Sequence, residues 1–334
     1  MPRGLRSSTT RRASSSTVEI TSPRCRDVDA FAALRFAIGG GFLLAAASSD
    51  LRARKVSDRW WIALGSIGLV LLAVQLDVER ADAAAAALLG SAALLFYAIF
   101  FGDPLLDQDG FHLRPLRIGL FLAAGALFVF PAALHAALGE GLPRETLDLY
   151  SLPAMVVIYQ GFYWARLLHG GADAKGLIAL SLLVPTYPEA SPFPLLAAGP
   201  RAEGLFRSVF PFSLVVWVDA LVLFLAIPLG LVLANTIRGD FALPQAFLGY
   251  RARVDAFPRF VWLMEKIDDR GQHVLVLFPK RGTKVEENLS RLRAAGIERV
   301  WVTPQIPFMV LILGGFVLAF LGGNLLLAIL RPGA

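Results

Sequence analysis

Long apolar runs separated by short polar segments dominate the hydrophobic pattern of the chain. A transmembrane helix needs about 20 consecutive apolar residues, and eight runs fit a span or part of one. The sixth is too short to cross the hydrocarbon layer unaided, so it fits a half-helix or a helix that its neighbours lengthen. The predicted spans are Ala30–Ser49, Trp60–Leu76, Asp82–Phe101, Leu116–Leu138, Tyr150–Leu168, Ala172–Val184, Phe212–Ile237 and Ile306–Leu330.

Two polar segments are longer than ordinary loops between spans. Residues 1–29 are rich in Arg and Ser and hold few core-forming side chains, so we expect a disordered basic tail. Within residues 238–305, the continuous apolar run His273–Phe278 predicts a strand. Val285–Ala295 carries apolar residues at helical spacing, and Arg299–Thr303 predicts a second strand. Strand, helix and strand in succession indicate a small α/β module.

Composition supports a membrane protein. Apolar residues make up 56% of the 334-residue chain and charged residues 17%, and its mean hydropathy is +0.61. Soluble domains have about 45–50% apolar and 25% charged residues, so a water-soluble globular protein is excluded. A single cysteine excludes disulfide scaffolds and paired-cysteine zinc sites. The predicted fold is therefore an all-α polytopic membrane protein with about eight transmembrane helices and a small cytoplasmic α/β insertion before the last helix.

We expect four segments: the tail (1–29), a membrane core (30–237), the module (238–305), and the last helix with the C-terminus (306–334). Positive charges orient them, because cytoplasmic loops are enriched in Lys and Arg. The module holds twelve such residues and the loop 51–59 holds four, whereas the opposite loops hold Arg80, Arg144, Arg201 and Arg207. This asymmetry places the loop 51–59 and the module in the cytoplasm, although the basic tail favours the opposite orientation. We interpret the net charge of +6 as an orientation signal and expect no nucleic-acid partner.

Acidic residues within or at the ends of spans are energetically costly, which makes them functional candidates. They are Asp50, Asp103, Asp107, Asp173 and Asp219. Asp50 lies at the end of one span and Asp173 at the start of another. Both are predicted on the same side of the membrane, so they can meet. Asp103 and Asp107 fit a solvated loop, and Asp219 fits a buried structural pairing. Each motif also has a simpler interpretation without catalysis: Asp50 marks the end of one helix, and Gly170–Asp173 marks the start of another.

Two carboxyl groups that face one water are the minimum for aspartic hydrolysis. One is ionised and takes a proton from the water, and the other is protonated and polarises the peptide carbonyl. Asp50 lies at a helix C-terminus and Asp173 at a helix N-terminus, so the helix dipoles favour Asp173 as the base and Asp50 as the acid. Arg52, Arg54 and Lys55 oppose this assignment if they reach Asp50.

The stretches Asp50–Trp61 and Gly170–Lys175 resemble the two active-site motifs of type IV prepilin peptidases, in particular the archaeal branch that processes preflagellins and pilins. Val300–Met309 is also similar to that branch, and the resemblance covers most of residues 30–330. It implies a GxGD-type aspartic peptidase with Asp50 and Asp173 as the catalytic pair. The supporting motif residues are Gly170, Gly171, Ala172, Lys175, Arg52 and Lys55.

The chain departs from the family pattern in three places. Ala172 occupies the third position of the GxGD motif, Asp58 replaces the usual Asn of the first motif, and about 45 residues around the fourth span are additional. Bacterial members that also methylate the new N-terminus carry paired zinc-binding cysteines, which this chain lacks. The resemblance therefore implies a peptidase without N-methyltransferase activity, metal or cofactor.

The resemblance implies cleavage of short basic leaders from pilin or archaellin precursors at the cytoplasmic face of the cell membrane. The alternative is an ion- or proton-coupled transporter in which Asp50 and Asp173 bind ions. Transporters place such acids near the midplane of the bilayer, whereas both of these are predicted at cytoplasmic span ends. The sequence therefore favours the peptidase.

Overall fold

The computed structural model describes residues 30–101, 106–107, 110–111, 114–168, 170–187, 193, 195, 211–268, 270–279 and 284–325. The predicted tail, His169 and the side chains of Asp103 and Asp107 lie outside the described residues, as does the last span beyond Leu325.

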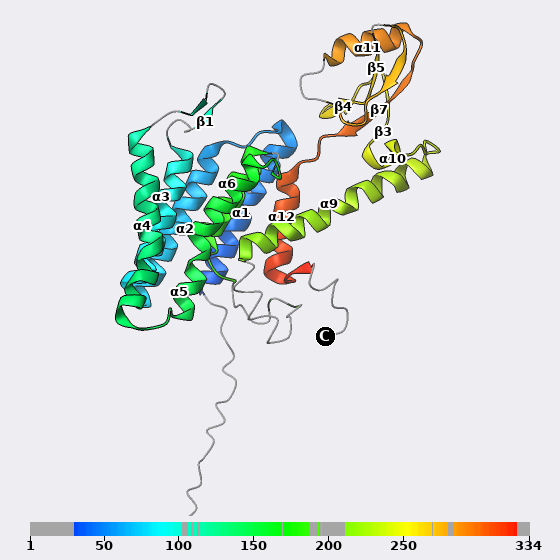
Figure 1. The fold of residues 1–334 in the computed structure, drawn as a ribbon. Helices are drawn as coiled ribbons and strands as arrows, with labels where there is room; N and C mark the ends of the chain where they lie inside the picture. Colours follow the sequence, from blue (N-terminus) through cyan, green and yellow to red (C-terminus); the bar gives the residue numbers. More distant parts are fainter. Residues whose placement is uncertain are drawn as a thin grey trace, which may run out of the picture.

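A bundle of apolar helices forms the larger part of the molecule, and a small mixed module lies beyond one end of it (Figure 1). Two short strands, β1 (Leu106–Asp107) and β2 (Gly110–Phe111), pair between α3 and α4. The helices of the bundle are α1 (Ala30–Ala53), α2 (Asp58–Val78), α3 (Ala83–Phe100), α4 (Pro115–Leu138), α5 (Arg144–Leu149), α6 (Ser151–Trp164), α7 (Gly171–Leu183), α9 (Phe212–Ile237) and α12 (Phe308–Leu321).

Among the described residues, five helices are long and apolar enough to cross a membrane by length and composition: α1, α2, α3, α4 and α9. They support a multi-pass membrane protein, but the predicted count of eight spans is not confirmed. The predicted fifth span stops at Trp164, because Arg166 adopts a left-handed backbone with a φ of 59°. Helix α7 has 13 residues and ends before Pro185, and α12 has 14 and ends before the pair Gly322–Gly323.

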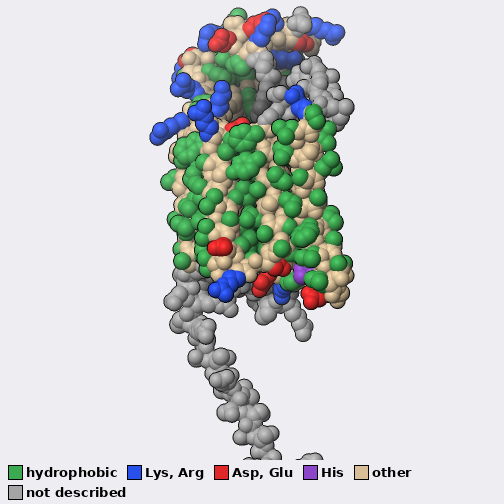
Figure 2. All heavy atoms as spheres, turned by 90° about the vertical axis from the view of Figure 1, so that its left-hand side faces the viewer, with side chains coloured by type: hydrophobic (Ala, Val, Ile, Leu, Met, Phe, Trp, Pro, Cys, Tyr) green, Lys and Arg blue, Asp and Glu red, His purple; other side chains and the backbone are tan. Residues whose placement is uncertain are grey.

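Hydrophobic side chains fill the bundle and also cover its outer face. Figure 2 shows this apolar surface over the bundle, with charged side chains gathered at its two ends and on the module. A stripe of hydrophobic exterior bounded by charges is what a bilayer requires of helices that cross it. The arrangement agrees with a membrane-embedded bundle and a module in water.

Close packing fixes α7 against α2. A Cβ atom on Gly68 would lie 2.6 Å from the backbone nitrogen of Leu183, so only a glycine lets the two backbones approach this closely. Nearer the start of α7, a Cβ on Gly176 would lie 3.3 Å from the ring of the fully buried Trp61. The position of the α7 N-terminus is therefore set by the packing of α7 against α2 between Trp61 and Gly68.

The module contains all three elements that the sequence predicts, and four more. They are α10 (Gln245–Leu248), β3 (Tyr250–Arg253), β4 (Val261–Leu263), β5 (Glu265–Ile267), β6 (His273–Leu275), α11 (Val285–Ala294) and β7 (Arg299–Pro304). Strands β3, β7 and β4 form an antiparallel sheet in that order, and β5 and β6 form a separate hairpin. The predicted strands β6 and β7 thus belong to different sheets.

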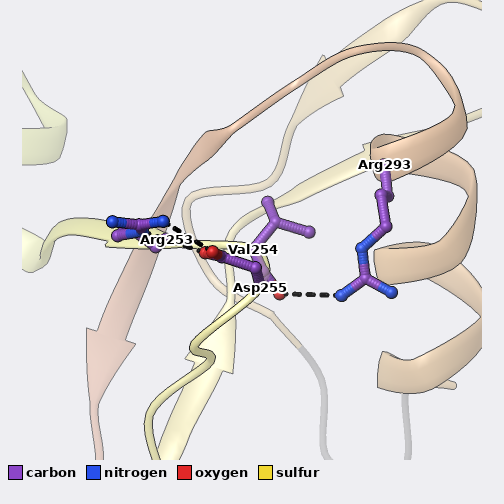
Figure 3. A network of polar contacts seen from close by, with 4 residues as sticks. All are labelled: Arg253, Val254, Asp255 and Arg293. Atoms are coloured by element: carbon purple, nitrogen blue, oxygen red, sulfur yellow. Dashed lines mark hydrogen bonds and ion pairs between the residues drawn. The ribbon is translucent and has the colours of Figure 1, made fainter.

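Apolar and polar contacts hold α11 on the sheet. Leu292 is fully buried in a cluster with Val254 and Val300. The guanidinium group of Arg293 donates a 3.2 Å hydrogen bond to the carbonyl oxygen of Val254, at the end of β3 (Figure 3). In the same view, Arg253 pairs with Asp255 at the surface. The module is thus a folded unit with its own apolar cluster.

Polar contacts also join the module to the end of α9. The buried Asn235 donates hydrogen bonds to the carbonyl oxygens of Ala246 and Gly249, at 3.1 and 2.7 Å. Arg299 of β7 forms a bidentate ion pair with Asp240, just after α9. These bonds fix the module to the helix that enters it.

Candidate active site

The ends of α1, α7 and α12 meet at the end of the bundle that faces the module (Figure 1). Helix α1 delivers Asp50 in its last turn, and α7 delivers Asp173 in its first. The apolar runs place these helices, and the polar motif residues lie where the runs stop.

The Asp50 side chain is hydrogen-bonded to a residue 259 positions later in the chain. The backbone N–H of Met309, in the first turn of α12, donates a 3.3 Å hydrogen bond to Oδ2 of Asp50. The carbonyl oxygen of Asp50 accepts a 3.0 Å hydrogen bond from the N–H of Arg54, the first residue after α1. Both the side chain and the backbone of Asp50 are therefore held in place.

The Asp173 carboxyl group folds back over the start of its own helix. It accepts a hydrogen bond from the backbone of Gly170, which precedes α7 as its N-cap residue. A Cβ atom on Gly170 would lie 2.8 Å from Cγ of Asp173 and 3.2 Å from its Oδ1. Position 170 therefore needs a glycine for the carboxyl group to occupy this place.

The other two residues of the second motif carry no such requirement. A Cβ on Gly171 would meet the ring of Tyr163 at 3.7 Å, an ordinary van der Waals distance. Ala172 lies in the first turn of α7 and packs against the core, outside the left-handed backbone region. The alanine at the third position of the GxGD motif therefore fits without strain.

Lys175 connects the two motifs. Its Nζ donates a 2.5 Å hydrogen bond to Oδ2 of Asp58, the first residue of α2, and lies 5.5 Å from the centre of the Phe100 ring. The second departure from the family pattern has a physical role here, because Asp58 supplies a negative charge opposite Lys175. Opposite charges in the two motifs were a sequence signal for this contact.

The basic residues of the first motif lie at the surface or next to the module. Arg52 and Lys55 are exposed, and the carbonyl oxygen of Lys55 accepts a 2.7 Å hydrogen bond from the hydroxyl group of Ser49. The Cζ atom of Arg54 lies 5.0 Å from the centre of the Phe260 ring in the module. Neither the contact of Phe260 with Arg54 nor the hydrogen bond from the Met309 N–H to Asp50 was predicted from the sequence.

The two carboxyl groups interact electrostatically, since the charge of Asp50 acts on the carboxyl group of Asp173. The opposite helix ends of Asp50 and Asp173 predicted different roles for them. In the structure, however, the Asp50 carboxyl group also lies at a helix N-terminus, that of α12. The helix dipoles therefore do not distinguish a base from an acid.

Asp219, the other acidic candidate whose side chain the structure describes, takes no part in this arrangement. Asp219 is fully buried in α9 and accepts a 3.0 Å hydrogen bond from the N–H of Leu325, which agrees with a structural role. Asp103 and Asp107 have no described side chains. Among the described residues, no group of three or more His, Cys, Asp or Glu side chains could hold a metal ion.

Comparisons with known proteins give two matches. A family model described as "Archaeal Peptidase A24 C-terminus Type II" matches residues 242–325, which include most of the module and α12. The preflagellin peptidase of Methanocaldococcus jannaschii is 27% identical over 180 residues, which cover 52% of this chain and 71% of that protein. Both matches support a peptidase, although Asp50 and Asp173 lie outside the residues that the family model matches.

The matched C-terminal region, the similarity to a preflagellin peptidase and the two aspartate motifs agree with one another. Together they support the assignment of this chain to the archaeal prepilin/preflagellin peptidase family.

Proposed function

We propose that this protein is a membrane aspartic endopeptidase that removes short basic leader peptides from prepilin- or preflagellin-like proteins. One observation carries the proposal. Asp50 and Asp173 come from separate motifs, lie at helix ends on one side of an apolar bundle, and interact electrostatically. The name of the archaeal relative supports leader processing as the reaction.

Mutual repulsion gives the two carboxyl groups different protonation states and therefore different roles. Two carboxylates held close together, away from bulk water, do not both ionise easily, so one keeps its proton. The ionised carboxylate takes a proton from a water molecule, whose oxygen attacks the peptide carbonyl carbon. The protonated carboxyl group donates to the carbonyl oxygen. When the C–N bond breaks, a proton passes to the leaving nitrogen, and no metal or cofactor is required.

The position of the site suits a precursor with a polar leader and an apolar helix. Such a helix can lie in the bilayer beside the bundle, while the leader stays in water at the end of the helices. The Lys and Arg residues of the loop 51–59 and of the module favour the cytoplasm for this end. Acids at the end of the spans, rather than at the midplane, favour a peptidase over a transporter.

The proposal is tested by co-expressing the full chain with a pilin-like or archaellin precursor and measuring the precursor by mass spectrometry. We expect Asp50→Asn and Asp173→Asn each to abolish leader removal, because each substitution leaves only one of the two carboxyl groups that the reaction requires. Asp77→Asn is the matched control, since Asp77 is exposed at the other end of α2. Asp103→Asn and Asp107→Asn should also retain most activity.

The amount of each variant in the membrane fraction shows whether it is inserted. Leader removal at the normal rate by inserted Asp50→Asn or Asp173→Asn would exclude the proposed catalytic pair. The product mass also tests the predicted lack of methyltransferase activity, because N-methylation adds one methylene unit to the new N-terminus.

A further inference from the structure

The module touches the segment that directly follows the proposed catalytic Asp50 at the end of α1. Arg54 follows Asp50 by one helical turn, and its guanidinium carbon lies 5.0 Å from the centre of the Phe260 ring. Phe260 belongs to the connection between β3 and β4, so this contact joins the module to the connection between α1 and α2. A cation over an aromatic face is attractive, and more so when water is excluded.

Two features show that Arg54 is committed to this contact. Its Nε and Nη1 atoms are buried and have no hydrogen-bond partner among the described residues, and the Phe260 ring lies against the guanidinium group. Arg54 and Phe260 also both have left-handed backbones, with φ values of 54° and 56°. Such angles cost free energy in bulky residues and persist where the surroundings hold them.

Phe260 is also bonded to the segment that leads into α12. Its carbonyl oxygen accepts a 2.8 Å hydrogen bond from the N–H of Gln305. Four residues later, the N–H of Met309 donates to the Asp50 carboxylate. This series of contacts therefore begins and ends at Asp50. It passes from Asp50 through Arg54, Phe260, Gln305 and Met309.

We propose that Phe260 is a positioning residue for Asp50, and that the module orients the proposed catalytic carboxylate by holding Arg54 on one side and the start of α12 on the other. This inference rests on the proposed function. If Phe260 loses its ring, Arg54 and the linker before α12 are no longer held to a common point. The Asp50 carboxyl group then departs from its place relative to Asp173, and the chemical step slows.

The test compares variants of the full chain in membranes with a synthetic precursor, measuring kcat and KM separately. We expect Phe260→Leu to lower kcat about tenfold with little change in KM, because misplacing a catalytic group affects the chemical step. Phe260→Trp keeps an aromatic face and should restore most of kcat. Phe278→Leu makes the same chemical change at a 77% exposed ring of the module and should have no effect.

A double-mutant cycle isolates the contact itself. Arg54→Gln should lower kcat about as much as Phe260→Leu does, and the double variant should be no slower than either. Because Arg54 lies outside the module, this arm remains informative if Phe260→Leu does not fold. Independent, multiplicative effects of the two substitutions would overturn the positioning role.

The outcomes separate this inference from the proposed function. Normal cleavage by Asp50→Asn would refute the function itself. An inactive Asp50→Asn variant together with a normal kcat for Phe260→Leu and Arg54→Gln would refute only the positioning role. A fall in thermal stability of Phe260→Leu without a fall in kcat would show that the ring only stabilises the module.

Discussion

Gly170 and Gly171 form a matched pair in which the same substitution has opposite expected effects. An added Cβ at position 170 would lie 2.8 Å from Cγ of Asp173, so the carboxyl group must move away and lose its hydrogen bond from the Gly170 backbone. An added Cβ at position 171 would meet its nearest atom at 3.7 Å, in the Tyr163 ring. Gly170→Ala therefore displaces a proposed catalytic group, and Gly171→Ala does not.

The expected magnitudes follow from the displacement. A misplacement of a catalytic group by about 1 Å can cost about 10²-fold in rate, which corresponds to about 2.7 kcal/mol of transition-state stabilisation. Gly170→Ala should lower kcat by that order with a small effect on stability, because a short side chain moves rather than the backbone. Alanine is favoured over glycine within a helix by up to about 1 kcal/mol, so Gly171→Ala should be slightly stabilised and fully active.

The assay is a time course of precursor cleavage by each variant, followed by mass spectrometry, with thermal unfolding of the same preparations. The reasoning requires a selective loss in Gly170→Ala. Full activity of Gly170→Ala would show that the carboxyl position seen here is not needed for cleavage. Equal losses in both variants would show that the motif is sensitive to any added carbon.

Two further predictions concern the connection of the motifs and the orientation of the chain. Lys175→Glu should lower activity more than Asp58→Asn does, because it places like charges together, whereas an asparagine still accepts the Lys175 hydrogen bond. Normal activity of both variants in the cleavage assay would exclude a role for this pair. Lys284 is exposed in the module, and Lys284→Cys in a chain with Cys25→Ser provides a single cysteine for labelling. This cysteine should react with an impermeant thiol reagent only after cell lysis, and labelling in intact cells would reverse the proposed topology.

The sequence by itself determined the features that depend on local composition and spacing. The apolar run Phe212–Ile237 predicts α9 with the bounds that the structure has, and Val285–Ala295 predicts α11 to within one residue. Apolar length and helical periodicity report burial in lipid or in a core, and both are properties of neighbouring residues. The positions of Asp50 and Asp173 at the ends of apolar runs could be predicted in the same way.

Tertiary structure decided which distant residues meet. The strands β6 and β7 are visible in the sequence, but their partners, β5 for one and β3 with β4 for the other, are not. Their pairing depends on the turns and packing of the whole module. The predicted fifth span, Tyr150–Leu168, is longer than α6, because apolar residues continue past the point where the backbone leaves the helix, whereas the predicted Ala172–Val184 agrees with α7 to within one residue.

The site shows the same division. The Lys175–Asp58 pair joins residues 117 positions apart and was not predicted, although the opposite charges of the two motifs are visible in the sequence. The donor to Asp50 is a backbone N–H, 259 residues away, and a backbone group has no side-chain signature in any sequence. The contact between Arg54 and Phe260 depends on two left-handed residues that are neither glycine nor asparagine. Local preference disfavours both conformations, so only the packing of the module against the bundle could select them.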